Sequence, residues 1–163
     1  MDPVSLLSDL KASLGTRGRV LVACSGGLDS MALLHSALEV FDVSDVFVGT
    51  VNHALHARSG EFEAFVVAYA ASRGVRVRVG RACPEAIAKG AGVEDGARRE
   101  RYRLLDGMAD ALGVDVILMA HHLDDQVETV MMRLSEGSGL KGLRGIPMRR
   151  GRYVRPFIGM RRA

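Results

Sequence analysis

The residues Ser25-Gly26-Gly27-Leu28-Asp29-Ser30 carry the clearest chemical signal in this sequence. They follow an apolar run at 19–24 that is typical of a buried parallel strand, and they precede apolar residues at helical spacing. Glycines at such a turn let backbone N–H groups approach phosphate oxygens, and the dipole of the following helix adds partial positive charge. The loop therefore predicts an anion site, in which Asp29 and Ser30 cap the helix or reach a metal ion held by phosphates. An ordinary capped strand–helix turn is the alternative that these residues alone leave open.

A second polar cluster, at 120–129, begins a predicted helix at 123–135. Glu128 lies three or four residues from both Asp124 and Asp125, so the three carboxylates share one face of that helix. Such a group binds Mg²⁺ or a cationic substrate, or acts as a base, unless the two aspartates only complement the helix dipole. For His121 and His122 we favour orienting or capping roles over metal binding. The opposite face is an apolar stripe that we expect to be buried, made of Leu123, Val127, Val130, Met131 and Leu134.

A third candidate is Arg101, which lies on the apolar stripe of a predicted helix at 94–112. An inward-facing arginine needs an anion, which here is either Glu94 or a bound phosphate. Arg98 shares a face with these two residues, and an intrahelical pair with Glu94 is its alternative role. The stripe that we expect to be buried consists of Val93, Ala97, Leu104, Leu105, Met108 and Leu112.

The elements that must position these residues alternate between strands and helices. Predicted strands lie at 19–24, 45–52, 75–79, 115–120 and 153–154, and predicted helices at 3–15, 29–41, 59–73, 85–89, 94–112 and 123–135. The fold class is therefore α/β: an open, mainly parallel, doubly wound sheet with helices on both faces. In such a sheet ligands bind beyond the carboxyl ends of the strands. Polar clusters follow three of those ends, at 25–30, 51–56 and 120–129, so we expect them to form one site.

Composition limits the classes of function. The 163 residues suffice for one domain with a buried core, and no apolar run is long enough to span a membrane. Two cysteines without metal-binding spacing argue against a disulfide framework or a zinc site, and the N-terminus does not read as a signal peptide, so we expect a cytoplasmic protein. The net charge of +3 is uneven, because residues 137–163 hold eight basic side chains and no acidic one. Such a segment is typical of an edge that binds a polyanion, or of a solvated tail.

The loop at 25–30 lacks the lysine of a Walker A motif and resembles the SGGxDS pyrophosphate loop of the N-type ATP pyrophosphatases. With the later motifs, residues 18–160 resemble the N-terminal catalytic domain of the tRNA(Ile)-lysidine synthetases, which belong to this PP-loop superfamily. The further motifs that carry the resemblance are Val51-Asn52-His53-Ala54-Leu55, Glu94 with Ala97-Arg98 and Arg101-Tyr102, the run from Ala120 to Thr129, Gly137-Ser138-Gly139 with Gly142-Leu143, and Arg155-Pro156.

The resemblance implies a reaction in two steps. ATP adenylates O2 of the wobble cytidine in a tRNA(Ile) with a CAU anticodon, and L-lysine then displaces AMP at C2. It implies that ATP binds Ser25, Gly26, Gly27, Leu28, Asp29, Ser30, Val51 and His53, with Asp29 holding Mg²⁺. The catalytic residues that it implies are Asp29, Arg98, Arg101 and Asp125, and the residues that receive lysine are Asp125 and Glu128.

The family usually reads His-Gly-Leu-Arg at the end of the second strand, where this chain has Ala54 and His56. We expect residues 1–163 to form a single PP-loop ATP-binding domain, shortened at its C-terminus and without tRNA-binding C-terminal domains. A basic edge at 137–163 is expected to meet tRNA phosphates, and a homodimer is a further expectation. The alternatives are an ATP-dependent tRNA 2-thiolation enzyme, which two cysteines disfavour, and an ATP-binding fragment without catalysis.

Overall fold

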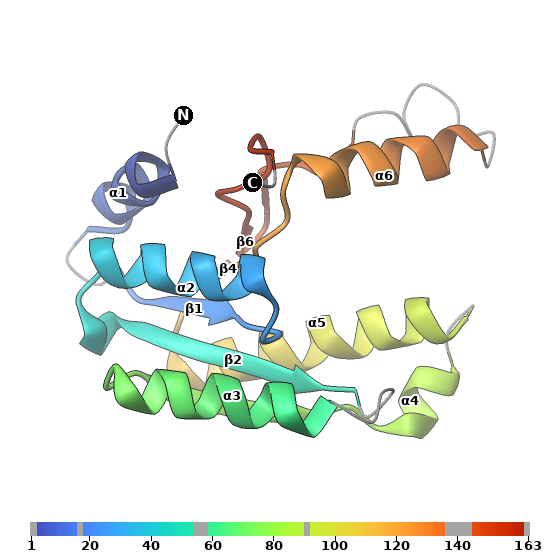
Figure 1. The fold of residues 1–163 in the computed structure, drawn as a ribbon, viewed down its shortest axis with the longest axis horizontal. Helices are drawn as coiled ribbons and strands as arrows, with labels where there is room; N and C mark the ends of the chain where they lie inside the picture. Colours follow the sequence, from blue (N-terminus) through green and yellow to red (C-terminus); the bar gives the residue numbers. More distant parts are fainter. Residues whose placement is uncertain (1–2, 16–17, 54–58, 90–91, 136–144, 162–163) are drawn as a thin grey trace.

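The structure is a computed structural model that describes residues 3–15, 18–53, 59–89, 92–135 and 145–161 (Figure 1). Its helices are α1 (Pro3–Leu14), α2 (Leu28–Val40), the 3₁₀ turn η2 (Val43–Asp45), α3 (Ser59–Ser72), α4 (Pro84–Ala88), α5 (Val93–Leu112) and α6 (Leu123–Ser135). Its strands are β1 (Val20–Ala23), β2 (Val46–Asn52), β3 (Arg76–Arg81), β4 (Val116–Leu118), β5 (Arg149–Arg150) and β6 (Tyr153–Val154).

The strands form one six-stranded sheet in the order β3-β2-β1-β4-β6-β5. All neighbouring pairs are parallel except β5 and β6, which are antiparallel. The chain runs from β1 outward to β2 and β3, and then returns to place β4 on the other side of β1. The strand order therefore reverses between β1 and β4, which is the position where open α/β sheets bind ligands.

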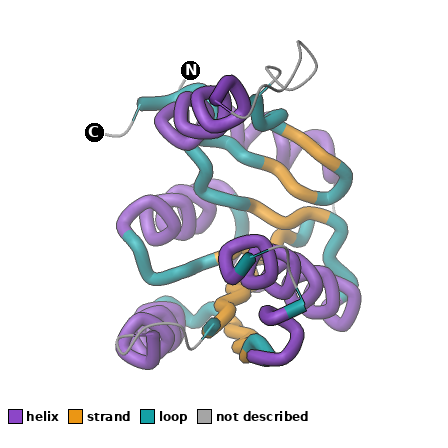
Figure 2. The backbone as a smooth tube through the Cα atoms, turned by 90° about the vertical axis from the view of Figure 1, so that its right-hand side faces the viewer, coloured by secondary structure: helices purple, strands orange, loops and turns teal. Residues whose placement is uncertain are grey.

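Each face of the sheet has its own apolar core, because alternate residues of a strand point to opposite faces. On one face, Val20 and Val22 of β1 pack with buried residues of α1, α2 and α3, including Leu7, Leu34 and Val66. On the other face, Leu21 packs with Phe47 of β2 and with Leu105 and Ala109 of α5. Figure 2 shows the strands lying between helices on two sides, which confirms the predicted doubly wound arrangement.

The predicted positions of the main elements are confirmed to within a few residues. Strand β4 is shorter than predicted, and Arg149–Arg150, which lie outside the predicted strands and helices, pair with β6. None of the helices in the described part of the chain has the length and hydrophobicity that a bilayer crossing requires. The predictions that involve Ala54, His56 and the glycines at 137–142 lie outside the described residues.

Two predictions of buried side chains are wrong. Val93 is exposed at the start of α5, although Leu105 of the same stripe is buried. The apolar stripe of α6 is not buried either, since Met131 is 61% exposed and Val127 and Leu134 are exposed by half or more. Figure 1 shows the reason: α6 extends away from the sheet. Helical periodicity identifies the apolar face of α6, but no described residue covers that face.

Candidate nucleotide-binding site

A cleft of about 290 Å³ lies at the carboxyl ends of β1, β2 and β4, where the three predicted polar clusters meet. We call it the nucleotide cleft. The residues of 25–30 that line it are Ser25, Gly27, Leu28, Asp29 and Ser30. Val51 and His53 join them from the end of β2, Arg101 from α5, and Asp125 from α6. The structure thus brings together nine of the twelve residues that the sequence nominated.

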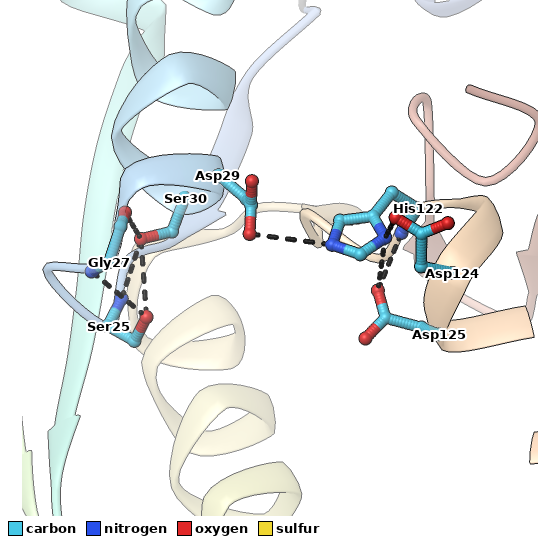
Figure 3. A network of polar contacts seen from close by, with 7 residues as sticks. All are labelled: Ser25, Gly27, Asp29, Ser30, His122, Asp124 and Asp125. Atoms are coloured by element: carbon cyan, nitrogen blue, oxygen red, sulfur yellow. Dashed lines mark hydrogen bonds and ion pairs between the residues drawn. The ribbon is translucent and has the colours of Figure 1, made fainter. Parts of the chain in front are cut away.

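The loop from Ser25 to Ser30 is held in shape by its own serine hydroxyls (Figure 3). Ser30 Oγ donates to the Gly27 carbonyl oxygen at 2.8 Å and accepts from the Ser25 backbone N–H at 3.2 Å. The Gly27 N–H points to Ser25 Oγ at 3.4 Å. The α2 helix begins at Leu28, so these bonds fix the loop against a helix N-terminus, where backbone dipoles favour an anion.

The two glycines of this loop have different surroundings. Gly26 has a φ of +84°, and a Cβ there would press against the Phe62 side chain and backbone at 3.0–3.2 Å. The fold itself therefore requires glycine at this position. Gly27 has a φ of −76°, which any residue adopts, and a Cβ there would meet only Ser25 Oγ at 3.5 Å. Because Gly27 lines the cleft, a side chain there would take up room in the cleft.

His122 connects α6 to the loop from Ser25 to Ser30, which we call the phosphate loop. Its ring is buried, and its Nε2 lies 3.5 Å from an Asp29 oxygen while its Nδ1 lies 3.4 Å from Asp125 Oδ2 (Figure 3). The same Asp125 oxygen accepts the His122 backbone N–H at 2.7 Å, which caps the first turn of α6. Asp125 therefore has a structural contact through one oxygen and faces the cleft as well.

The opposite wall of the cleft is cationic. Arg101 lies there with its Nε buried and without a hydrogen-bond partner, and no described residue forms an ion pair with it. Burial, with the like charge of Arg98, lowers the pKa of this guanidinium. A buried guanidinium without an anion is unfavourable, so the site fits a bound phosphate. Of the two anions that we considered for Arg101, Glu94 is exposed and does not pair with it among the described contacts.

Two neutral histidines flank Arg101. Burial, followed by the charges of Arg155 and Arg101, lowers the pKa of His121 to about 4. Burial and the charge of Arg101 also lower the pKa of His53. Both rings carry a buried Nδ1 without a hydrogen-bond partner, so they offer the cleft neutral polar groups at pH 7.

Three nominated residues do not line the nucleotide cleft. Gly26 lies behind the loop against Phe62. Arg98, one turn before Arg101 on α5, lines a different cavity. Glu128 is exposed on α6, one turn beyond Asp125.

Sequence reasoning missed several residues that line the cleft, among them Cys24, Gly49, Met119 and the bridging role of His122. The sequence places these residues at or near the ends of predicted strands. That position alone does not distinguish a residue that lines the cleft from one that is buried in the core. Burial raises the pKa of the Cys24 thiol to about 12, so this cysteine remains protonated.

The carboxylates fit a magnesium ion that is held chiefly by phosphates. No group of three acidic, histidine or cysteine side chains within the described ranges is arranged to hold a metal by itself. Asp29 lies at the N-terminus of α2 and lines the cleft, so it offers one carboxylate beside the predicted phosphate position. Mg²⁺ in nucleotide sites commonly takes only one or two protein carboxylates and completes its shell with phosphates and water.

Comparisons with known proteins agree with this geometry. The tRNA(Ile)-lysidine synthase of Ralstonia nicotianae is 42% identical over 150 residues, covering 88% of this chain and 32% of that protein. The tRNA(Ile)-lysidine synthase of Methylobacterium sp. (strain 4-46) is 43% identical over 159 residues, covering 91% of this chain and 44% of that protein. The chain thus spans about a third to a half of the length of these curated relatives.

Among solved structures, the U34-tRNA thiolase from Methanococcus maripaludis with its 4Fe–4S cluster superposes with a TM-score of 0.76. It is 16% identical, and the match covers 98% of this chain and 59% of that one, so the likeness is one of fold. Residues 5–163 match the family described as the PP-loop domain, an ATP-binding family. The chain belongs to the PP-loop domain family.

Proposed function

We propose that this chain carries the catalytic domain of a tRNA(Ile)-lysidine synthetase, an ATP-dependent ligase that forms a carbon–nitrogen bond. The substrates are ATP, L-lysine and a tRNA(Ile) with a CAU anticodon, and the products are lysidine at the wobble position, AMP and pyrophosphate. The observation that carries the proposal is the nucleotide cleft, in which a phosphate loop, an unpaired arginine and a carboxylate meet. The names of the similar relatives support the choice of substrate.

The residues divide the chemistry between them. The loop at 25–30 binds the phosphates of ATP, and Arg101 faces the α-phosphate, where negative charge develops as O2 of the cytidine attacks and pyrophosphate leaves. Asp29 would hold Mg²⁺, which neutralises charge on the phosphates. Val51 and His53 flank the adenosine end from β2.

Lysine enters from the α6 side in this proposal. Asp125 faces the cleft, and Glu128 lies one helical turn farther along α6. Carboxylates hold an ammonium group by charge-assisted hydrogen bonds, and one of them accepts the proton before the amine attacks C2 and AMP leaves with O2. The free oxygen of Asp125 suits this role, because its other oxygen caps α6.

A thiolation enzyme is less well supported by the residues in place. If the two cysteines of this chain carried the sulfur, their thiols would have to be reactive and to reach the activated base. Cys24 lines the cleft but has a raised pKa, and Cys83 is exposed before α4, outside the cleft, with its thiol donating to Glu85 at 2.6 Å.

The test is direct. The chain is incubated with ATP, labelled lysine and a tRNA(Ile) transcript that bears CAU, and the label in tRNA and the release of AMP are measured. We expect both to require ATP, and Arg101→Lys to slow AMP release about 10²–10³-fold, because lysine lacks the planar donor set. Arg73→Lys, after the end of α3, is the control with full activity.

Two results would contradict the proposal. AMP release with sulfur but not lysine in the tRNA would identify a thiolation enzyme. ATP binding without any AMP release would identify a nucleotide-binding module. The cytoplasmic location and the homodimer remain parts of the same proposal, tested by cell fractionation and by the mass of the chain in solution.

A further inference from the structure

A second cavity, of about 610 Å³, lies between α5 and the hairpin formed by β5 and β6. We call it the arginine cleft. Five arginines line it: Arg98 and Arg99 from α5, and Arg150, Arg152 and Arg155 from the hairpin and the residue after it. Such a concentration of guanidinium groups in one cavity is stabilised by internal acidic partners or by an external anion.

Two of the five arginines have internal partners. Arg99 lies 3.3 Å from Asp95 one turn earlier on α5, and it donates to the Lys89 carbonyl oxygen at 2.9 Å. Arg152 donates to Asp110 near the end of α5 at 2.8 Å. The Arg152 contact ties the hairpin to the helix, and the two ion pairs neutralise two of the charges. Arg152 is therefore a structural residue rather than part of a free basic edge.

The other three arginines have no acidic partner among the described residues. Arg150 is exposed on β5. Arg98 lies with its guanidinium 5.7 Å from the centre of the Tyr102 ring. Arg155 is only 3% exposed, and although one of its amino groups donates to the Pro147 carbonyl oxygen at 3.0 Å, its Nε is buried without a partner. A buried arginine in this state lacks the anion that would offset its desolvation.

The arginine cleft adjoins the nucleotide cleft. The Tyr102 ring lines the arginine cleft and is near an arginine of each cavity, with Arg98 at 5.7 Å and Arg101 at 5.8 Å from its centre. The charges of Arg155, Arg101 and Arg98 all act on His121, a wall residue of the nucleotide cleft, with Asp125 acting in the opposite direction. The two cavities therefore share one positive region, which runs from the predicted α-phosphate position to the hairpin.

We propose that the arginine cleft binds phosphodiester groups of single-stranded RNA, namely those next to the nucleotide that enters the nucleotide cleft. This inference rests on the proposed function, in which one base of a polynucleotide must reach the α-phosphate while its backbone continues outside. Three guanidinium groups without an acidic partner, on α5, on β5 and just after β6, match a chain of phosphates better than a single small anion. Contacts of this kind position a nucleic acid without reading its sequence.

The test compares two neighbouring residues of β5. Arg150 lines the arginine cleft, whereas Arg149 is an exposed arginine of the same strand that does not line it. A short fluorescent single-stranded RNA with CAU at its centre is titrated against the unmodified chain, Arg150→Glu and Arg149→Glu. We expect Arg150→Glu to weaken binding about tenfold or more and to reduce the salt dependence by about one phosphate contact. Arg149→Glu should weaken it less than threefold.

ATP-induced stabilisation against heating serves as the control for folding and should be the same in all three proteins. Equal losses in both variants would overturn the inference, because diffuse charge would then explain binding. So would an unmodified chain that binds inorganic pyrophosphate in an Arg150-dependent manner but no RNA, since the cavity would then be a small-anion site.

The lysine-transfer assay separates this inference from the proposed function. Lysidine formation with equal RNA binding by both variants would overturn only the inference. Arg150-dependent RNA binding without lysine transfer would overturn only the proposed function.

Discussion

Two adjacent glycines of the phosphate loop meet different physical demands. Gly26 needs a left-handed backbone and contacts Phe62 closely, so its requirement comes from the fold. Gly27 has an ordinary backbone conformation and open space on the cleft side, so the fold would accept a larger residue. We therefore expect that any requirement for glycine at position 27 comes from a bound ligand and not from the fold.

We expect Gly27→Ala to keep its stability and to lose ATP binding. The added methyl group contacts only Ser25 Oγ in the free protein, but it intrudes on the phosphate position. The measurement is the midpoint of thermal unfolding with and without ATP, since a ligand that binds only the native state raises it. Gly26→Ala is the matched variant and should lose stability by about 1–3 kcal/mol, from the positive φ and the contact with Phe62. Equal stabilisation by ATP in Gly27→Ala and in the unmodified chain would contradict this reading.

At the residue scale, the sequence predicted the parts of the site that lie in short contiguous runs. The phosphate loop could be recognised because its glycines, its acid and its helix start are adjacent in the chain. The bridge from Asp29 through His122 to Asp125 could not, since it joins residues almost a hundred positions apart. The sequence also could not predict that Arg98 and Arg101 line different cavities. Their spacing of one helical turn does not determine which cavity each side chain lines.

At the scale of elements, the close packing of α4 against α5 depends on Gly96, which has no side chain to separate the two helices. A Cβ at Gly96 would overlap the carbonyl oxygen and backbone of Ile87 in α4. Nearby, Glu100 is 4% exposed and binds Arg103 through two hydrogen bonds of 2.7 and 2.8 Å, which keeps the pKa of this carboxyl below its ordinary value. The close approach of Gly96 to Ile87 packs α4 against the helix that carries Arg98 and Arg101.

Gly96→Ala should therefore lower the free energy of unfolding by about 2 kcal/mol or more, although alanine is the better helix former. Urea unfolding followed by circular dichroism measures the change. The control lies on the same helix: a Cβ at Gly107 meets nothing within 4 Å, so Gly107→Ala should be neutral or stabilise by up to about 1 kcal/mol. Similar values for the two variants would mean that α4 does not pack on α5 as described.

The α6 helix illustrates a limit of periodicity. The sequence correctly predicted which residues share the apolar face of this helix. Whether that face is buried depends on the elements that pack against it, and in the described part of the chain the face is exposed. Two hydrogen bonds hold the start of α6. Asp125 accepts the His122 backbone N–H, and the Leu123 N–H donates to the Met160 carbonyl oxygen at 2.8 Å. Asp125 is thereby fixed, while Glu128 remains exposed.

Glu128→Gln tests the lysine site on this helix. The change keeps the shape and removes the charge, so the KM for lysine should rise about tenfold or more, while adenylation at saturating tRNA, measured as pyrophosphate release, stays within about twofold. The KM is read from the assay with labelled lysine, and pyrophosphate is measured separately. Glu39→Gln, an exposed carboxylate on α2, should leave both values unchanged. Loss of ATP binding with an unchanged KM for lysine would assign Glu128 to the metal site instead.

At the scale of the whole molecule, the sheet explains why three distant segments form one site. Parallel strands put their carboxyl ends at one edge, and the reversal of strand order between β1 and β4 opens that edge for a ligand. This much followed from alternating strands and helices in the sequence. The strand at 153–154, which is β6, was also predicted, but its partner β5 was not, because two residues are too few for any periodic pattern.

The same site makes the stability of the whole molecule depend on pH. The pKa of His121 is about 4 in the folded chain and 6.5 when unperturbed, because burial and the charges of Arg155, Arg101 and Arg98 oppose its protonation, with Asp125 acting in the opposite direction. The unfolded chain therefore binds more protons between these values. The stability that the neutral ring supports is present above about pH 6.5 and is lost as the pH falls toward 4.

We expect the free energy of unfolding to fall by about 2 kcal/mol between pH 7 and pH 5 through His121 alone. His53, whose pKa is also lowered, acts in the same direction. Urea unfolding at a series of pH values measures the slope, and His121→Gln should make it shallower, whatever its effect at pH 7. His35→Gln, on α2 where the side chain is 54% exposed, is the matched substitution against which the change in slope is compared. If His121→Gln and the unmodified chain lose stability in parallel on acidification, the positive region around His121 does not act on its ring.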